Sequence, residues 1–327
     1  MKKVALITGI LGQDAAYLSQ FLLNKGYHVV GLYRRTTRPS FENLDYLGIT
    51  KKIEFIQGDM TDQASLNHIV RLTKPDEIYN LASQSFVGGS WDYPESTTEI
   101  NAVGTLYLLE AMRHHAPKAH FYQASTSEMV GTGRKNEAQN EQTPFHPKSP
   151  YAIAKLYAHW MTVCYRESFG LFCCSGILWN HESPLRGKEF VTRKITDAVT
   201  RIELGKQKEL FLGNIDSTRD WGFSGDYVEA MWLMLQQKEP EDFCIASGES
   251  HSIRDFLDEA FAVIGIKDWT PYVKLDAQFN RPNDVVYLHG DASKARKKLG
   301  WKPKTTFKEL VKMMMDADFK RNRDLKE

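Results

Sequence analysis

Two polar segments in the first half of the chain hold the groups best suited to acid/base chemistry. The first contains Thr126 and Glu128, and the second contains Tyr151 and Lys155. Residues four apart share one face of a helix, so Tyr151 and Lys155 would lie side by side. The pKa of a phenol is near ~10, and a neighbouring ammonium favours the ionised form, so this pair can serve as a general base near neutral pH. The same spacing also occurs in ordinary amphipathic helices.

The helix that would carry this pair begins at Pro150, a residue suited to the first helical position, and keeps apolar residues at helical spacing to about Phe169. Glu128 follows the end of a predicted strand and could act as a second acid/base group. Its alternative interpretation is a surface residue that opens a loop.

A glycine turn at the start of the chain predicts a dinucleotide site. Residues 3–8 form a short apolar run typical of a strand buried in a parallel sheet, and residues after Ala15 follow a helical pattern that ends at Gly26. Gly9 permits the tight turn between them, and Gly12 lets the backbone approach a pyrophosphate. The small side chain of Ala15 allows close packing of helix and strand, with the helix N-terminus facing the anion.

The second predicted strand, residues 27–33, ends at Arg34 and Arg35. A cofactor with a free ribose 2′-hydroxyl usually meets an acidic residue there, whereas arginines suit a 2′-phosphate. We therefore expect NADP rather than NAD. The alternative is a solvated basic loop that also includes Arg38.

Further strands are predicted at 53–57, 77–81, 119–125 and 172–178. Together they predict an α/β fold with a Rossmann-type doubly wound parallel sheet and a smaller C-terminal substrate-binding lobe. We expect residues 1–179 to form the NADP-binding domain, with 215–240 returning to it, and 180–214 and 241–327 to form the substrate lobe. A helix at 189–204 would expose Arg193 and Lys194, and residues 219–222 would form a polar loop.

Composition excludes several partners. The chain has 327 residues and a net charge of +1, so it lacks the overall charge expected of a nucleic-acid or membrane-surface protein. Its four cysteines have no metal-type spacing, and we expect reduced thiols, no metal site and a cytoplasmic location.

The chain resembles the extended short-chain dehydrogenase/reductases, and most closely the bacterial GDP-mannose 4,6-dehydratases. The resemblance covers nearly the full length and is carried by residues 8–14, 80–88, 121–128, 150–157, 180–184, 186–187, 190–194 and 219–222. The glycine turn and Tyr-x-x-x-Lys occur throughout the superfamily, whereas Asn-His-Glu-Ser-Pro and Arg-Asp-Trp-Gly together are specific to the dehydratases.

The resemblance implies that Tyr151 removes the proton of the sugar 4-hydroxyl while hydride passes from C4 to NADP. Lys155 would lower the tyrosine pKa, Thr126 would hydrogen-bond the 4-oxygen, and Glu128 would take the C5 proton and assist loss of the 6-hydroxyl. It implies cofactor binding by Gly9, Gly12, Gln13, Asp14, Arg34, Arg35, Asp59, Met60, Leu81, Ala82, Ser83, Tyr151, Lys155, His181 and Arg186. It implies substrate binding by Ser85, Glu128, Asn180, Val191, Lys194, Gly213, Arg219, Arg281 and Asp284.

Three alternatives to a GDP-mannose dehydratase stay open at this point. The substrate could be a GDP-activated heptose of manno configuration, because departures such as Trp179 and Asp284 could reshape the sugar end of the pocket. An epimerase or reductase would use Tyr151 without eliminating water. A non-catalytic dinucleotide sensor would keep the fold alone. The resemblance also implies a homodimer or homotetramer.

Overall fold

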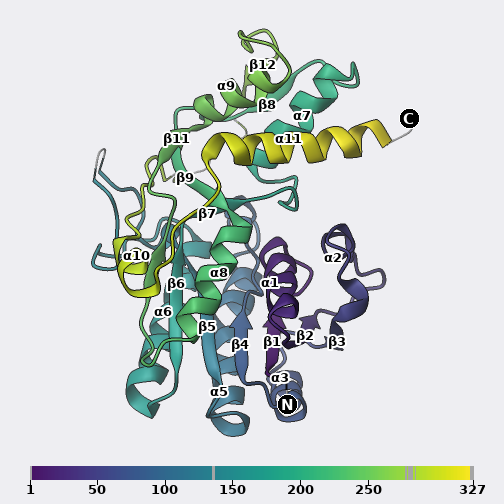
Figure 1. The fold of residues 1–327 in the computed structure, drawn as a ribbon. Coiled ribbons are helices and arrows are strands. Elements are labelled where there is room, and N and C mark those ends of the chain that lie inside the picture. The colour runs from purple at the N-terminus through teal and green to yellow at the C-terminus, as the bar shows by residue number, and fades with distance from the viewer. Residues whose placement is uncertain (1, 135–136, 277, 279–282, 284, 325–327) are drawn as a thin grey trace.

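A seven-stranded parallel sheet forms the centre of the molecule (Figure 1). The computed structural model describes residues 2–134, 137–276, 278, 283 and 285–324. In spatial order the strands are β10 (Phe243–Ile245), β6 (Cys173–Leu178), β5 (His120–Thr126), β4 (Glu77–Asn80), β1 (Val4–Thr8), β2 (His28–Tyr33) and β3 (Glu54–Gln57). All neighbouring strands pair in parallel. The predicted Rossmann-type sheet is thereby confirmed.

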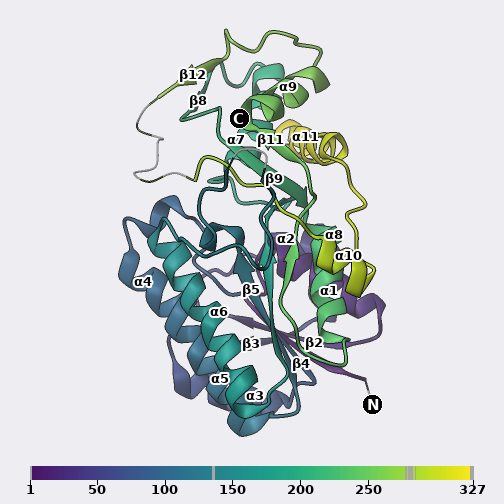
Figure 2. The same cartoon turned by 90° about the vertical axis from the view of Figure 1, so that its left-hand side faces the viewer.

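Helices cover both faces of this sheet because its strands are apolar on both sides. In β1, Ala5 and Ile7 point to one core while Leu6 points to the other, as the two-residue period of a strand requires. The first face packs against α1 (Gln13–Asn24) and α8 (Ser224–Leu235), which contact each other. The opposite face is covered by α3 (Gln63–Thr73), α5 (Gly104–His115) and α6 (Pro150–Phe169) (Figure 2).

A second hydrophobic core lies beyond the carboxyl ends of the sheet strands (Figure 1). Helices α7 (Val191–Glu203), α9 (Ile253–Val263) and α11 (Phe307–Asp324) surround it. Two small sheets accompany them: β11 (Ser250–Ser252), β9 (Thr218–Phe223) and β7 (Asn180–Glu182) form one, and β12 (Val273–Leu275) and β8 (Leu210–Leu212) form the other. Three further short helices are α2 (Glu42–Tyr46), α4 (Pro94–Thr98) and α10 (Ser293–Leu299).

Two local predictions in the second half are wrong. The segment 219–222, expected to be a polar loop, lies in β9, where Asp220 is fully buried. Its carboxylate accepts hydrogen bonds from the backbone N–H groups of Ser247, Gly248 and Gly290, which makes the burial of this charge possible. Arg193, expected to be exposed, is only 6% exposed.

Between α4 and α5 the backbone forms a π-helical turn, Glu99–Val103. Such turns are rare and often occur beside functional sites. Here the turn carries Asn101, a buried residue that reaches the loop after β4.

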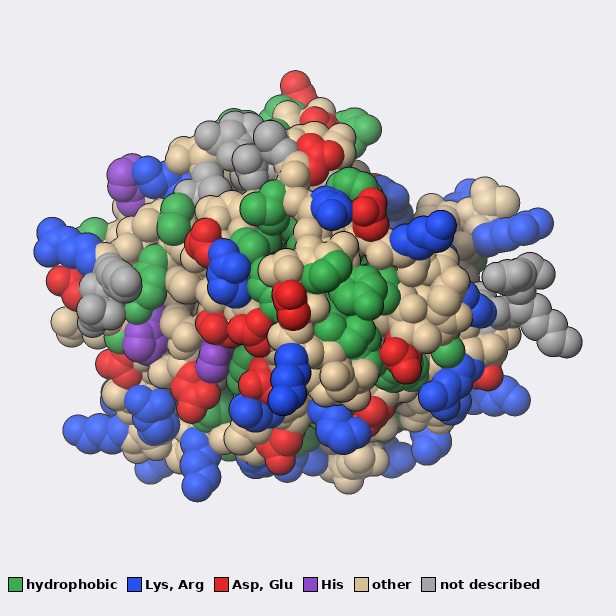
Figure 3. All heavy atoms as spheres, turned by 90° about the horizontal axis from the view of Figure 1, so that it is seen from above, with side chains coloured by type: hydrophobic (Ala, Val, Ile, Leu, Met, Phe, Trp, Pro, Cys, Tyr) green, Lys and Arg blue, Asp and Glu red, His purple; other side chains and the backbone are tan. Residues whose placement is uncertain are grey.

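The surface seen from above mixes both signs of charge, with basic and acidic side chains interspersed (Figure 3). Within the described part of the chain, no helix has both the length and the apolar character that a membrane crossing needs.

Candidate active site

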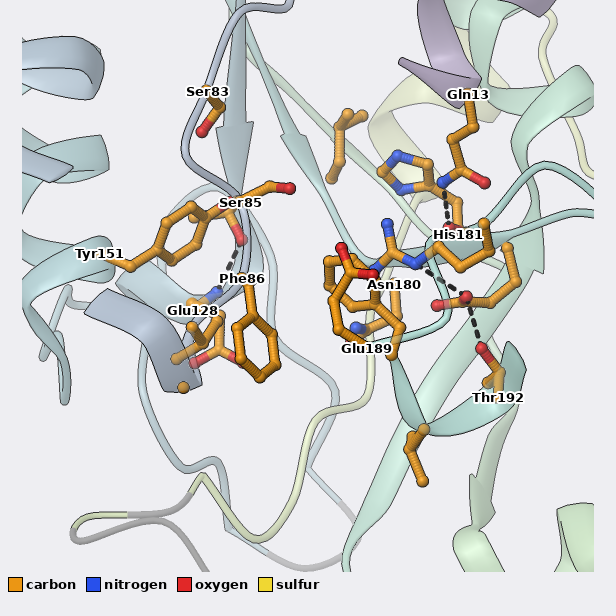
Figure 4. Close-up of a pocket in the computed structure, with 18 of the residues that line it drawn as sticks. Gln13, Ser83, Ser85, Phe86, Glu128, Tyr151, Asn180, His181, Glu189 and Thr192 are labelled. Carbon is orange, nitrogen blue, oxygen red and sulfur yellow. Dashed lines mark hydrogen bonds and ion pairs between the residues drawn. The ribbon is translucent and has the colours of Figure 1, made fainter. Parts of the chain in front are cut away.

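A cavity of ≈ 1120 Å³ lies between the carboxyl edge of the parallel sheet and the second core. One wall carries Tyr151, Glu128 and Ser85, and the facing wall carries Asn180 and Thr192 (Figure 4). The cavity is lined by the following residues that the sequence predicts as site residues: Gly9, Gly12, Gln13, Asp14, Arg34, Leu81, Ser83, Ser85, Thr126, Glu128, Tyr151, Lys155, Asn180, His181, Arg186, Val191, Lys194, Gly213 and Arg219. The structure thus brings together side chains from both halves of the sequence.

Four predicted cofactor residues, Arg35, Asp59, Met60 and Ala82, do not line this cavity. Met60 is buried against Gly104, and Asp59 accepts hydrogen bonds from the N–H and hydroxyl of Thr61. The predicted substrate residues Arg281 and Asp284 lie outside the described residues.

The glycine turn has the geometry that a bound pyrophosphate requires. Gly9 has φ +67°, and a Cβ there would come within 2.8 Å of the Ala82 Cα, so only glycine fits without displacing backbone. The Gly12 N–H donates to the Gly9 carbonyl at 2.9 Å, and Gly12 is the N-cap of α1. The first turn of α1 therefore presents its backbone N–H groups at the cavity, as an anion site needs. This turn and the exposed Arg34 on the rim fit a dinucleotide.

Buried hydrogen bonds hold the loop after β4 beside the glycine turn. The Thr8 hydroxyl accepts from the N–H groups of Leu81 and Ala82, and it donates to Asn80 at 2.7 Å. Asn101 exchanges hydrogen bonds with the backbone of Gln84 and accepts from the Ser83 hydroxyl. The Thr8 and Asn101 side chains therefore position the predicted residues Leu81 and Ser83. The sequence did not predict a role for Asn101, because the residues that it contacts are distant from it in the chain.

Helix α6 brings Tyr151 and Lys155 to the wall of the cavity. Ser149 caps it by accepting from the Ala152 N–H, and Pro150 occupies the first helical position, as predicted. The Lys155 Nζ lies 5.9 Å from the centre of the Tyr151 ring and donates to the Ala124 carbonyl at 3.0 Å. Thr126, the last residue of β5, accepts from the Glu128 N–H at 3.2 Å. Two separate segments of the chain thereby converge.

The pKa of Tyr151 departs from its usual value in the direction opposite to our expectation. Burial raises it to about 12, although a hydrogen bond with Thr126 and the charge of Arg186 act to lower it. Burial also lowers the pKa of Lys155 to about 8, against the opposing charge of Asp14. In the protein alone, desolvation of each group therefore outweighs the charges and hydrogen bonds that oppose it.

Glu128 lies in the turn after β5 and is only 7% exposed. Its carboxylate is near enough to Tyr151 to raise the pKa of that phenol. The alternative interpretation of Glu128 as an exposed loop residue is wrong.

Asp14 and His181, two predicted cofactor residues, form an ion pair with each other at 2.7 Å. The other ring nitrogen of His181 bonds the Trp179 carbonyl at 2.7 Å, and Asp14 accepts from the Ser224 hydroxyl at 2.6 Å. Burial alone would lower the pKa of His181, but the Asp14 carboxylate raises it overall, and His181 in turn lowers the pKa of Asp14. The pair connects α1 to β7, and the Gln13 side chain adds a second contact between them by donating a hydrogen bond to the His181 carbonyl.

Arg186 is surrounded by residues that the prediction left out. Its Nε lies 3.0 Å from Glu182, whose carboxylate also accepts from Thr192 at 2.6 Å. Its guanidinium carbon lies 3.5 Å from the centre of the Phe190 ring, which itself meets Phe86 edge to face. Both aromatic rings belong to segments that carried the family resemblance, which is the signal that could have identified them.

The cavity is also lined by Arg219 and Lys194, two cations among the predicted substrate-binding residues. Arg219 is 8% exposed and donates to the Thr218 carbonyl at 2.9 Å. Burial lowers the pKa of Lys194, with Asp276 opposing that effect. The Asn180 Oδ1 is buried and has no hydrogen-bond partner among the described residues. An amide oxygen in this position is available to a donor on a ligand.

Comparison with known proteins gives a consistent result. The family model of GDP-mannose 4,6 dehydratase matches residues 6–314. GDP-mannose 4,6 dehydratase 1 of Arabidopsis thaliana is 51% identical, over 97% of this chain and 90% of the relative. GDP-mannose 4,6 dehydratase of Homo sapiens is 46% identical, over 97% of this chain and 91% of the relative.

Solved structures show the same fold. UDP-glucose 4-epimerase of Thermus thermophilus, in complex with NAD, is 27% identical with a TM-score of 0.84, over 96% of this chain and 98% of that one. The dTDP-glucose 4,6-dehydratase DesIV of Streptomyces venezuelae is 24% identical with a TM-score of 0.87, over 98% of each chain.

Proposed function

This chain belongs to the GDP-mannose 4,6-dehydratase family, and from that membership we propose that it converts GDP-mannose into GDP-4-keto-6-deoxymannose with a nicotinamide cofactor. The observation that carries the proposal is the convergence of Thr126, Glu128, Tyr151 and Lys155 on one cavity beside the glycine turn. A dehydratase needs a second acid/base group to eliminate water, and the buried Glu128 supplies one. An epimerase eliminates no water and needs no such group.

Tyr151 takes the proton of the sugar 4-hydroxyl, and Thr126 holds the same oxygen by a hydrogen bond. When bound, a nicotinamide cofactor would supply reversible hydride transfer between C4 and C6 of the sugar. A phenol with a pKa of about 12 is almost fully protonated at neutral pH, so nearby positive charge must lower its pKa before it can accept a proton. Lys155 and Arg186 are the cations of this chain that are placed to contribute that charge.

Glu128 carries out the elimination. Oxidation at C4 makes the C5 proton acidic, and the Glu128 carboxylate removes it. The resulting carboxylic acid then donates that proton to the departing 6-hydroxyl, which leaves as water. The proton that Tyr151 took from the 4-hydroxyl would then go to C5 as C6 regains hydride, which restores Tyr151 and Glu128 to their starting states. Because Glu128 is buried beside Tyr151, one enclosed site can hold both proton-transfer groups close to the same sugar.

We propose NADP as the cofactor. Gly9, Gly12 and the first turn of α1 would hold its pyrophosphate, and Arg34, exposed on the cavity rim after β2, would contact the 2′-phosphate. Arg35 is exposed next to it but does not line the cavity.

The nucleotide-sugar would occupy the end of the cavity that Lys194, Arg219 and Asn180 line. Arginine and lysine suit a diphosphate because hydrogen bonds between opposite charges are strong. We accordingly propose that 180–214 and 241–327 form the substrate lobe and that 1–179, with 215–240, form the cofactor domain. The separate core around α7, α9 and α11 supports that division.

The outer face of α6 supports assembly with a second copy of the chain. Ile153, Tyr157 and Trp160 are 58%, 41% and 53% exposed at helical spacing on this face. We propose a homodimer or homotetramer, and light scattering would determine which. A cytoplasmic location stays a prediction of the sequence.

Incubation with GDP-mannose tests the function. The product should be lighter by one water, with no net change in reduced nicotinamide absorbance. Tyr151→Phe should abolish turnover while sparing NADP binding, and the matched control Tyr272→Phe, in the second core, should turn over normally. A product of unchanged mass, or stoichiometric consumption of NADPH, would contradict the proposal. Parallel assays with GDP-manno-heptose would identify the preferred sugar.

A further inference from the structure

The connection between β7 and α7 spans residues 183–190, and its first part, the loop 183–187, carries Arg186 to the cavity. On the side of the parallel sheet, the Ser183 hydroxyl donates to Gln13 at 2.8 Å and also accepts from the Leu185 N–H. Pro184 and Leu185 are buried. The course of this loop therefore determines where the Arg186 guanidinium lies.

On its other side, the loop is held by Arg193 from α7. One nitrogen of this guanidinium, Nη1, donates to the Pro184 carbonyl at 3.0 Å and to the Arg186 carbonyl at 2.9 Å. These two carbonyls flank Leu185, so one planar donor fixes the backbone on both sides of it. Arg193 itself does not line the cavity.

Asp318 on α11 holds Arg193 in turn. The Asp318 side chain is fully buried and lies 2.8 Å from the Arg193 Nε, 2.7 Å from the Thr196 hydroxyl and 2.9 Å from Arg321 Nη1. Arg321 also donates to the Pro184 carbonyl at 2.7 Å. A buried guanidinium without its carboxylate would carry an uncompensated charge, and it would have to leave the carbonyls to reach water.

At the cavity, the Arg186 guanidinium is held by contacts of its own side chain. Glu182 and the Phe190 ring hold its guanidinium, and its charge acts on both Tyr151 and Asp14. Arg186 thus lies where it can influence both the proposed base and the glycine turn. Its position depends on the carbonyl contacts behind it.

We propose that Arg193 and Asp318 are positioning residues for Arg186. Together they hold the loop 183–187 so that the Arg186 guanidinium faces the bound cofactor, although neither residue touches the cavity. This inference rests on the proposed function, in which the Arg186 charge acts on Tyr151, and on the sequence-based prediction that Arg186 binds the cofactor. It also makes the C-terminal helix α11 part of what determines cofactor affinity.

The test is a double-mutant cycle read by calorimetric titration of NADP into the protein without substrate. Arg186→Gln and Asp318→Asn should each weaken NADP binding by roughly 10-fold, the effect of losing one charge-assisted hydrogen bond. In the double variant, Asp318→Asn should add nothing, because the residue through which it acts is already gone. If Asp318→Asn folds poorly, Arg193→Lys provides the milder change, since an ammonium cannot reproduce the guanidinium geometry.

The control is Asp242→Asn, which breaks the ion pair between Asp242 and Arg166 far from the loop. It should lower the melting temperature and leave the NADP dissociation constant unchanged. A second readout is the pH profile of kcat/KM, whose acidic limb should move to higher pH in Asp318→Asn, because the Arg186 charge no longer favours ionisation of Tyr151.

Additive losses in the double variant, or unchanged NADP binding and pH profile in both Asp318→Asn and Arg193→Lys, would overturn the inference. Unchanged binding in Arg186→Gln would instead remove Arg186 from the cofactor site. Release of water from GDP-mannose tests the proposed function separately from both.

Discussion

Replacing Lys155 by Met should make the ligand-free protein more stable at pH 7 while it abolishes turnover. Lys155 is only 3% exposed, and its ammonium donates a hydrogen bond to the Ala124 carbonyl. Burial lowers its pKa from 10.5 to about 8, so the folded state holds this proton less tightly than the unfolded chain does. A buried ammonium that serves catalysis therefore lowers the free energy of unfolding of the protein.

The magnitude follows from the fall in the pKa of Lys155 from 10.5 to about 8, which corresponds to ~3 kcal/mol. Loss of the hydrogen bond to Ala124 reduces the gain little, since Gln123 also donates to that carbonyl at 3.1 Å. The free energy of unfolding should therefore rise by ~2–3 kcal/mol in Lys155→Met. Below pH 8 the ammonium persists in both states and the full gain is expected. Between pH 8 and 10.5 Lys155 loses its proton in the folded wild type before it does in the unfolded chain. The difference in the free energy of unfolding between Lys155→Met and the wild type should therefore shrink over this range.

Urea denaturation of the ligand-free proteins at several pH values between 7 and 10.5 measures this difference. Lys52→Met, at an exposed position, is the matched control and should change the free energy of unfolding little at any pH. A Lys155→Met variant that is no more stable than the wild type at pH 7 would contradict a destabilising buried ammonium. A difference in the free energy of unfolding that does not shrink as the pH rises would contradict it as well.

Two further outcomes are expected. Arg34→Gln should weaken NADP binding by roughly 10- to 100-fold and leave NAD binding nearly unchanged, as measured by calorimetry; equal losses for both cofactors would place the 2′-phosphate elsewhere. Gly9→Ala should lower the free energy of unfolding by about 2 kcal/mol or more and weaken NADP binding, because φ is +67° and the new Cβ would meet Ala82. Gly26→Ala, at φ +84° with nothing within 4 Å, should cost only about 1 kcal/mol, and equal costs would contradict the steric argument.

The parallel sheet could be predicted because β1, β2 and β6 are mostly apolar runs and because a glycine turn joins β1 to α1. Strand β9 could not, since Arg219 and Asp220 interrupt its apolar pattern. The burial of Asp220 depends on N–H groups supplied by residues 247, 248 and 290, and no local window contains them.

The candidate site divides in a similar way. Spacing placed Tyr151 beside Lys155 correctly, because helical periodicity is local. The direction in which the tyrosine pKa moves was not predictable, since it depends on how much water the folded chain excludes. Asp14 and His181 were expected to bind a cofactor, but their mutual ion pair depends on the meeting of α1 and β7, far apart in sequence.

One edge strand of the central sheet, β10, comes from a late part of the sequence. Strand β10, residues Phe243–Ile245, pairs with β6 only after the chain has passed through β7, β8 and β9. A fragment ending at residue 179 would leave β6, whose six residues are all buried in the complete protein, as an uncovered strand with unpaired N–H and C=O groups. Such a fragment would favour aggregation over a free nucleotide-binding unit, so dissection of this enzyme calls for internal substitutions or permutation rather than truncation.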